Sequence, residues 1–162
     1  MRTTGWRWAV LAILLGGCAA SNGLKEEAGT LRYDLGVADK LLVQNDLPRW
    51  ISERFQYQIY RFDQSMDDLY LETMWKTRLP LADEVQADEV RTRLIVRGRP
   101  RGKGSSATEL HVITLEVQYQ IRQGAQWLSV APSPQAVHQI RLIANDIKDR
   151  IATALRSPSG PW

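Results

Sequence analysis

The residue types that could carry chemistry are few in this chain, and they lie far apart. Cys18 is the single cysteine among 162 residues, and the only histidines are His111 and His138. A thiol or hydroxyl nucleophile needs an adjacent base, and a zinc site needs about four suitably spaced ligands. We therefore predict no catalytic residue, no metal and no cofactor, and we expect the protein not to be an enzyme. We expect His111 to be a buried, hydrogen-bonded core residue, and His138 to be exposed.

Cys18 ends a stretch that resembles the lipobox of bacterial lipoproteins, Leu15-Gly16-Gly17-Cys18. In that motif, Leu and two small residues precede an invariant cysteine. Arg2 and Arg7 precede the apolar run Ala9–Leu15, which is the order of a signal peptide. From Ala9 to Cys18 there are only ten residues, against the ~20 that a membrane-spanning helix needs. The alternative is an ordinary secretory signal, cleaved near Ala19-Ala20.

The lipobox resemblance implies a specific maturation. Residues 1–17 would be the signal peptide, cleaved between Gly17 and Cys18, and Cys18 would carry acyl chains such as palmitate. Each buried methylene contributes ~0.8 kcal/mol, so several chains anchor a protein durably. Ala19 follows the cysteine where Asp would retain a lipoprotein at the inner membrane of enterobacteria. We therefore expect the outer membrane, with the domain facing the periplasm.

The remaining 145 residues have the size of one domain. Without Arg2 and Arg7 they hold 19 basic and 18 acidic residues, so the net charge gives no support for nucleic-acid binding. With no second cysteine, no disulfide can form within the domain, and a hydrophobic core must hold it together.

The N-terminal third of the chain has mixed periodicity. Residues 18–30 are small and polar, and we interpret them as a lipidated tether. Residues 31–43 fit both a strand and a helix, and we favour a helix over 36–44. Asn45-Asp46 would cap a second short helix, with Pro48 in its first turn, ending near Arg54. Its apolar face would be formed by Leu47, Trp50 and Ile51.

The rest of the domain alternates as strands do and ends in a helix. We expect a hairpin of strands 55–59 and 69–75 about the polar residues 63–68, in preference to one helix through 50–69. Further strands are predicted at 90–97, 111–121 and 126–128, with a flexible basic loop at 98–107. Ser133-Pro134 opens an amphipathic helix that reaches Arg156, and residues 157–162 form a tail.

These elements predict an α+β domain over residues 31–156: an antiparallel meander of about four strands packed against the long C-terminal helix, with a short N-terminal helix. This order resembles the helix-grip domains of BamC lipoproteins of the β-barrel assembly machine. The shared features are the lipobox, a strand ending in Thr73-Met74-Trp75, an arginine-rich strand, a tryptophan near the end of the meander and a closing helix. BamC proteins have two such domains, and this chain has room for one.

One basic cluster could recognise anions: Arg91, Arg93, Arg97, Arg99, Arg101 and Lys103. The first three would share the solvent-facing side of a strand, where they could bind lipid phosphates, glycan carboxylates or an acidic partner. The plainer interpretation is a solvated face paired with Glu72 and Glu116. We expect the acidic segment 79–89 to be a solvated loop, and Trp50, Trp75 and Trp127 to be core residues.

Two functions follow as hypotheses. The first is a non-enzymatic lipoprotein that offers a protein-binding surface to an envelope assembly, with outer-membrane assembly suggested by the helix-grip resemblance. The second is a binding module for an anionic envelope glycolipid or glycan through the basic cluster.

Overall fold

The structure is a computed structural model that describes residues 28–64, 68–102 and 110–156. The predicted signal peptide, Cys18, most of the predicted tether, Lys103 and the tail lie outside the described residues. No helix in the described part of the chain is long and apolar enough to span a membrane.

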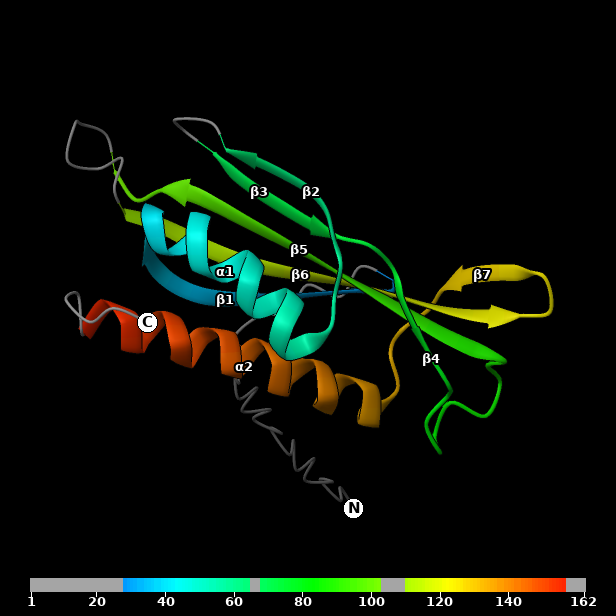
Figure 1. Ribbon diagram of the computed structural model, residues 1–162. Helices are drawn as coiled ribbons and strands as arrows, with labels where there is room; N and C mark the ends of the chain where they lie inside the picture. The colour runs from blue at the N-terminus through cyan, green and yellow to red at the C-terminus, as the bar shows by residue number, and fades with distance from the viewer. Residues whose placement is uncertain (1–27, 65–67, 103–109, 157–162) are drawn as a thin grey trace, which may run out of the picture.

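The fold is α+β, as predicted, with one antiparallel sheet and both helices on one face of it (Figure 1). The described strands are β1 (Thr30–Asp39), β2 (Ile59–Gln64), β3 (Leu69–Thr73), β4 (Lys76–Arg78), β5 (Glu89–Pro100), β6 (Leu110–Gln123) and β7 (Gln126–Ser129). The helices are α1 (Lys40–Phe55) and α2 (Pro134–Arg156). The main strand order is β1-β6-β5-β3-β2, with β4 also paired to β5 and β7 to β6.

The first strand is the main correction to the predicted fold. Residues 36–39 belong to β1, so the favoured helix over 36–44 is wrong in its first half. The register against β6 shifts between Asp34 and Gly36, where Gly36 has φ +95° and its N–H donates to Asp34 Oδ1 at 2.8 Å. This bulge changes which side of the strand faces inward. Leu31, Leu35 and Ala38 are therefore all buried, a spacing that imitates a helix.

Helix α1 begins earlier than predicted and is longer. Asp39, not Asn45-Asp46, caps it by accepting the Leu41 N–H at 2.7 Å, and Pro48 lies inside the helix rather than in its first turn. The predicted apolar face is confirmed, because Leu47, Trp50 and Ile51 are buried. Gln56 ends the helix with φ +58°, so residues 55–57 do not form the predicted strand.

The hairpin of β2 and β3 is confirmed, although β2 starts only at Ile59. The strand is then interrupted at Met74-Trp75, and β4 follows, paired with β5. Strand β5 runs to Pro100, so the predicted loop at 98–107 starts too early. Gly98 is buried within this strand. A Cβ there would lie 3.0 Å from Ile113 Cδ1 and 3.2 Å from Leu69 Cβ, so a larger residue would be crowded.

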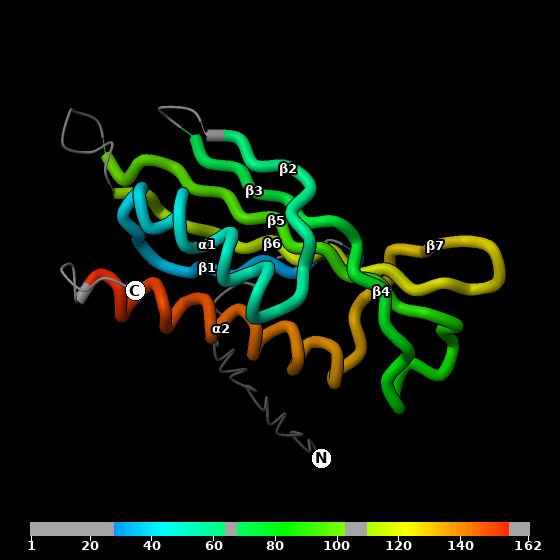
Figure 2. The backbone as a smooth tube through the Cα atoms, in the orientation of Figure 1, coloured from blue at the N-terminus to red at the C-terminus, as the bar shows by residue number. Residues whose placement is uncertain are grey.

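Strands β6 and β7 and helix α2 match their predicted positions. Ser133 caps α2 by accepting the Ala136 N–H at 3.2 Å. The core fills the space between helices and sheet, and its fully buried side chains include Leu71, Leu94, Leu115 and Ile147. Past the N-terminal end of α2, the sheet extends further as the β6–β7 hairpin, and the loop after β4 lies at the same end of the molecule (Figure 2). Neither α1 nor α2 lies over the opposite face of the sheet (Figure 1).

Candidate functional site

The predicted basic row lies on the face of the sheet opposite α1 and α2, which we call the open face. Alternation along β5 points Val90, Leu94 and Val96 into the core and Arg91, Arg93 and Arg97 outward. Arg99 continues the row, since β5 is longer than predicted, and Arg101 follows it as an exposed residue. The shared face of the first three arginines is therefore confirmed, and Lys103 lies outside the described residues.

Arg91 is held between two tryptophans. Its guanidinium carbon lies 4.5 Å from the ring centre of Trp75 and 4.1 Å from that of Trp127. Its Nε and Nη2 donate to Gln120 Oε1 at 2.9 and 2.6 Å. Burial between the rings, and then the neighbouring charge of Arg93, lower the pKa of Arg91. Stacking and donation from two nitrogens together fix the position of this side chain.

Arg93 is equally well satisfied. It forms an ion pair with Glu72, donates from Nε to Gln118 Oε1 at 2.7 Å, and lies 4.8 Å from the ring centre of Trp75. The Tyr70 hydroxyl donates to the other oxygen of Glu72 at 2.7 Å. The predicted cross-strand pairing through Glu72 is thus confirmed.

Glu116 pairs with a different residue than the sequence suggested. Its carboxylate accepts from Arg32 Nε of β1 at 3.3 Å and from Gln118 Nε2 at 3.0 Å. Because β1 was not predicted as a strand through its full length, this partner could not be identified from the sequence.

Arg97 and Arg99 differ from the first two arginines. Arg97 lies 5.1 Å from the ring centre of Tyr70, and neither guanidinium pairs with a carboxylate within the described residues. Both are exposed, and both line a hollow of about 610 Å³ on the open face. The other lining residues are Arg32, Tyr33, Asp34, Val112, Thr114, Leu115 and Glu116.

The tryptophan prediction is right for Trp50 and wrong for the other two. Trp50 is buried in the core, whereas Trp75 and Trp127 are half-buried on the open face. Trp75 appeared to share the inward side of β3, but the break at Met74-Trp75 ends that alternation before it. Spacing alone could not reveal this break.

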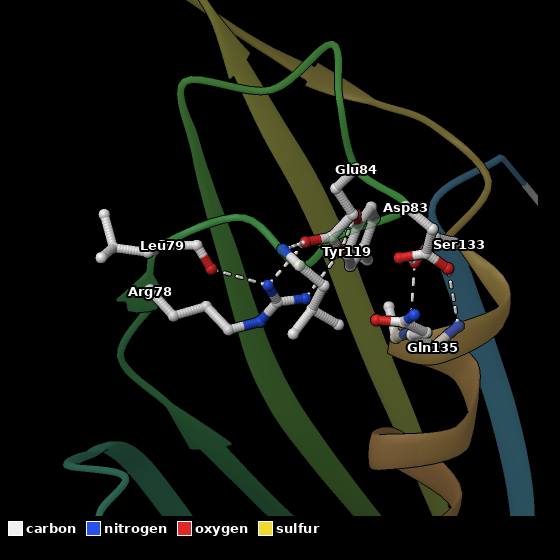
Figure 3. Close-up of polar contacts among 9 residues, drawn as sticks. Arg78, Leu79, Asp83, Glu84, Tyr119, Ser133 and Gln135 are labelled. Atoms are coloured by element: carbon white, nitrogen blue, oxygen red, sulfur yellow. Dashed lines mark hydrogen bonds and ion pairs between the residues drawn. The ribbon is translucent and has the colours of Figure 1, made fainter.

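The acidic segment after β4 is not a simple solvated loop. The Glu84 side chain is 2% exposed. Arg78 donates from Nη1 and Nη2 to the two carboxylate oxygens of Glu84 at 2.6 and 2.7 Å (Figure 3). The Tyr119 hydroxyl and the Leu81 N–H each donate to it at 2.6 Å. Burial alone would raise the pKa of Glu84, but these four hydrogen bonds outweigh burial and hold the pKa below its usual 4.5.

Neighbouring acids in this segment also bind the fold. Asp83 accepts from Ser133 Oγ at 2.8 Å and from the Gln135 N–H at 2.9 Å, at the start of α2 (Figure 3). Asp88 accepts the Gly124 N–H at 2.7 Å. The segment is therefore fastened to both α2 and the β6–β7 turn. Its carboxylates thus connect the segment to other elements of the fold.

The two histidines lie in different environments. His111 is fully buried, as expected, but neither ring nitrogen has a hydrogen-bond partner among the described residues, which corrects the expected hydrogen bond. His138 is exposed on α2, as expected. In residues 28–64, 68–102 and 110–156, no group of three or more His, Cys, Asp or Glu side chains could hold a metal ion.

No protein-family model matches the chain, and no curated protein matches it.

Proposed function

We propose that this chain is a bacterial outer-membrane lipoprotein, anchored by acyl chains on Cys18 and facing the periplasm. Its domain is a non-enzymatic binding component of the cell envelope that presents the open face of the sheet to a partner protein, in outer-membrane assembly. The anchor rests on the lipobox, Leu15 to Cys18. The binding role rests on one observation: an uncovered sheet face that carries arginines, tyrosine and tryptophans, residue types enriched at protein interfaces.

The tether length supports this placement. Ala28, where the described chain begins, lies ten positions after Cys18, and this stretch can span at most about 35 Å. The domain would thus remain close to the membrane, within reach of other envelope proteins.

The anchor is tested by labelling cells with a radioactive fatty acid. The intact protein should incorporate the label, and Cys18→Ala should not. Label on Cys18→Ala, or none on the intact protein, would refute the anchor.

The binding surface is tested by site-specific photocrosslinking in the native envelope. A photoreactive amino acid is placed at Val112, exposed on the open face, or at Leu142, exposed on α2. We expect an envelope protein to be captured from position 112 and not from position 142. Capture from neither position, or equally from both, would contradict a role for the open face.

A second candidate function is recognition of an anionic envelope glycolipid or glycan. The observation that favours it is that Arg97 and Arg99 line a hollow without a carboxylate partner among the described residues. Arg91 and Arg93 are less suited to this role, because two nitrogens of each guanidinium already donate within the protein.

A further inference from the structure

We propose that the hollow beside Arg97 and Arg99 binds a phosphate monoester group, carried either by a lipid headgroup or by a soluble molecule. This proposal rests on the second candidate function above and specifies the ligand class and the residues that would hold it.

The hollow exists because side-chain lengths differ along β6. In the register of the sheet, Arg91 and Arg93 lie opposite Gln120 and Gln118, which are long enough to accept their hydrogen bonds. Arg97 and Arg99 lie opposite Thr114 and Val112, which are short. The result is a trough with β6 as its floor and long side chains of β5 and β1 as its walls.

Two guanidinium groups on one wall suit a tetrahedral anion. Residues two apart on a strand point the same way and are separated by about 7 Å, so Arg97 and Arg99 can converge on one ligand. One guanidinium group satisfies both oxygens of a carboxylate, whereas the three oxygens of a phosphate monoester can accept hydrogen bonds from two guanidinium groups. The Thr114 hydroxyl on the floor, which makes only a long 3.5 Å contact with Arg97 O, offers a further donor.

Two carboxylates also line the trough, Asp34 on β1 and Glu116 on β6. Asp34 accepts the Gly36 N–H, and Glu116 accepts from Arg32 and Gln118. Because Arg32 of β1 lines the trough as well, positive and negative charges are mixed on that side, whereas the β5 side carries only the positive charges of Arg97 and Arg99. This asymmetry directs a phosphate to the β5 wall and disfavours ligands with a second anionic group extending across the floor.

The test uses the full chain in phosphatidylcholine nanodiscs, titrated by calorimetry with glycerol 1-phosphate and, separately, with acetate. We expect glycerol 1-phosphate to bind at least about tenfold more tightly than acetate, because only the phosphate accepts hydrogen bonds from both Arg97 and Arg99. Nanodiscs that also contain phosphatidic acid or phosphatidylglycerol distinguish the sources. If phosphatidic acid, a monoester, blocks the titration and phosphatidylglycerol, a diester, does not, the trough accepts a lipid headgroup. If neither blocks it, the ligand is soluble.

Three variants separate the trough from bulk charge. The double variant Arg97→Ala/Arg99→Ala should weaken binding at least about tenfold. Arg49→Ala/Arg141→Ala removes the same charge from exposed positions on α1 and α2 and should leave affinity unchanged. Thr114→Gln changes no charge, but it should weaken binding by filling the floor and engaging Arg97 as Gln118 engages Arg93.

Several results would overturn the proposal: no binding of glycerol 1-phosphate, equal binding of acetate, or equal losses in the two double variants. Circular dichroism and thermal melting of every variant verify that the fold is intact. Binding of soluble glycerol 1-phosphate requires neither a lipidated Cys18 nor a protein partner, so its failure is distinct from a failure of the labelling or crosslinking experiments. Only the comparison between the nanodisc lipids depends on the anchor, and it is made with protein that carries the fatty-acid label.

Discussion

Glu84→Gln tests whether the acidic segment after β4 is a structural clamp. The substitution keeps the side-chain shape and removes the charge that faces Arg78. It also places an amide nitrogen where the intact protein has only an acceptor for Arg78, Tyr119 and the Leu81 N–H. At least one donor would then face another donor in a site where Glu84 is 2% exposed.

The expected loss is large for a surface segment. Removing one partner of a fully buried ion pair costs about 3–5 kcal/mol. Arg78 is 27% exposed and can regain water, so we expect a loss of about 2–3 kcal/mol. For a domain of this size that corresponds to a fall in Tm of roughly 4–12 °C. Ion pairs open to solvent contribute about 0–1 kcal/mol, so Asp46→Asn, which removes the partner of the exposed Arg49, serves as the matched control.

The clamp also has a defined pH dependence. The folded protein lowers the pKa of Glu84 below the usual 4.5, so the unfolded chain binds this proton more readily. Stability from Glu84 is therefore fully present above about pH 4.5 and is lost as pH falls through the lower folded pKa. The difference in unfolding free energy between the intact protein and Glu84→Gln should narrow over that acidic range.

Urea denaturation at pH 7 and at several values below pH 4.5 measures both effects. A loss in Glu84→Gln no greater than in Asp46→Asn would refute the clamp, and a difference independent of pH would refute the assigned pKa shift. Should Glu84→Gln fail to fold, Tyr119→Phe removes one hydrogen bond and leaves the ion pair. We expect it to cost about 1 kcal/mol.

Three further substitutions test local features of the fold by thermal or urea unfolding. Gly29→Ala should destabilise the protein much more than Gly124→Ala, because both have positive φ but only at Gly29 would a Cβ lie 2.7 Å from Tyr119 O; equal losses would show that backbone strain alone matters. Gln56→Gly should raise the free energy of unfolding by about 1 kcal/mol, since it relieves a left-handed residue, and a lower Tm would contradict this. Arg91→Lys should cost about 1–2 kcal/mol, because an ammonium cannot stack flat between two indole rings; an unchanged midpoint in urea would argue against the stack.

The sequence predicted the elements whose periodicity is uninterrupted. Strand β6 alternates without a break from His111 to Ile121, and α2 follows both its cap at Ser133 and its apolar spacing. The bulge at Gly36 and the left-handed Gln56 are local backbone events without a regular pattern. Because of the bulge, the end of β1 was predicted as a helix, and because of Gln56, the residues at the end of α1 were predicted as a strand.

The candidate site was predictable in its parts but not in their arrangement. Alternation correctly placed Arg91, Arg93 and Arg97 on one face. It could not show which arginines are occupied, because that depends on the register between β5 and β6 and on residues brought by β1, β4 and β7. The burial of Glu84 likewise depends on Tyr119, which lies 35 residues further along the chain.

The register of β6 therefore divides the open face into two regions with different roles. Near Gln120, Arg91 and Arg93 are stacked on tryptophans and hydrogen bonded. The described chain also enters the sheet here, because Gly29 lies beside Ser129 and its carbonyl oxygen accepts the Tyr119 N–H. The trough above Thr114 lies about six residues along the strand, on the order of 20 Å away. The ten steps from Cys18 to Ala28 can span about 35 Å, so a chain anchored at Cys18 as proposed can bring the trough to the bilayer without unfolding any strand. A lipid phosphate and a soluble phosphate are thus both sterically accessible, and the choice between them depends on the occupancy measured in the two sets of nanodiscs.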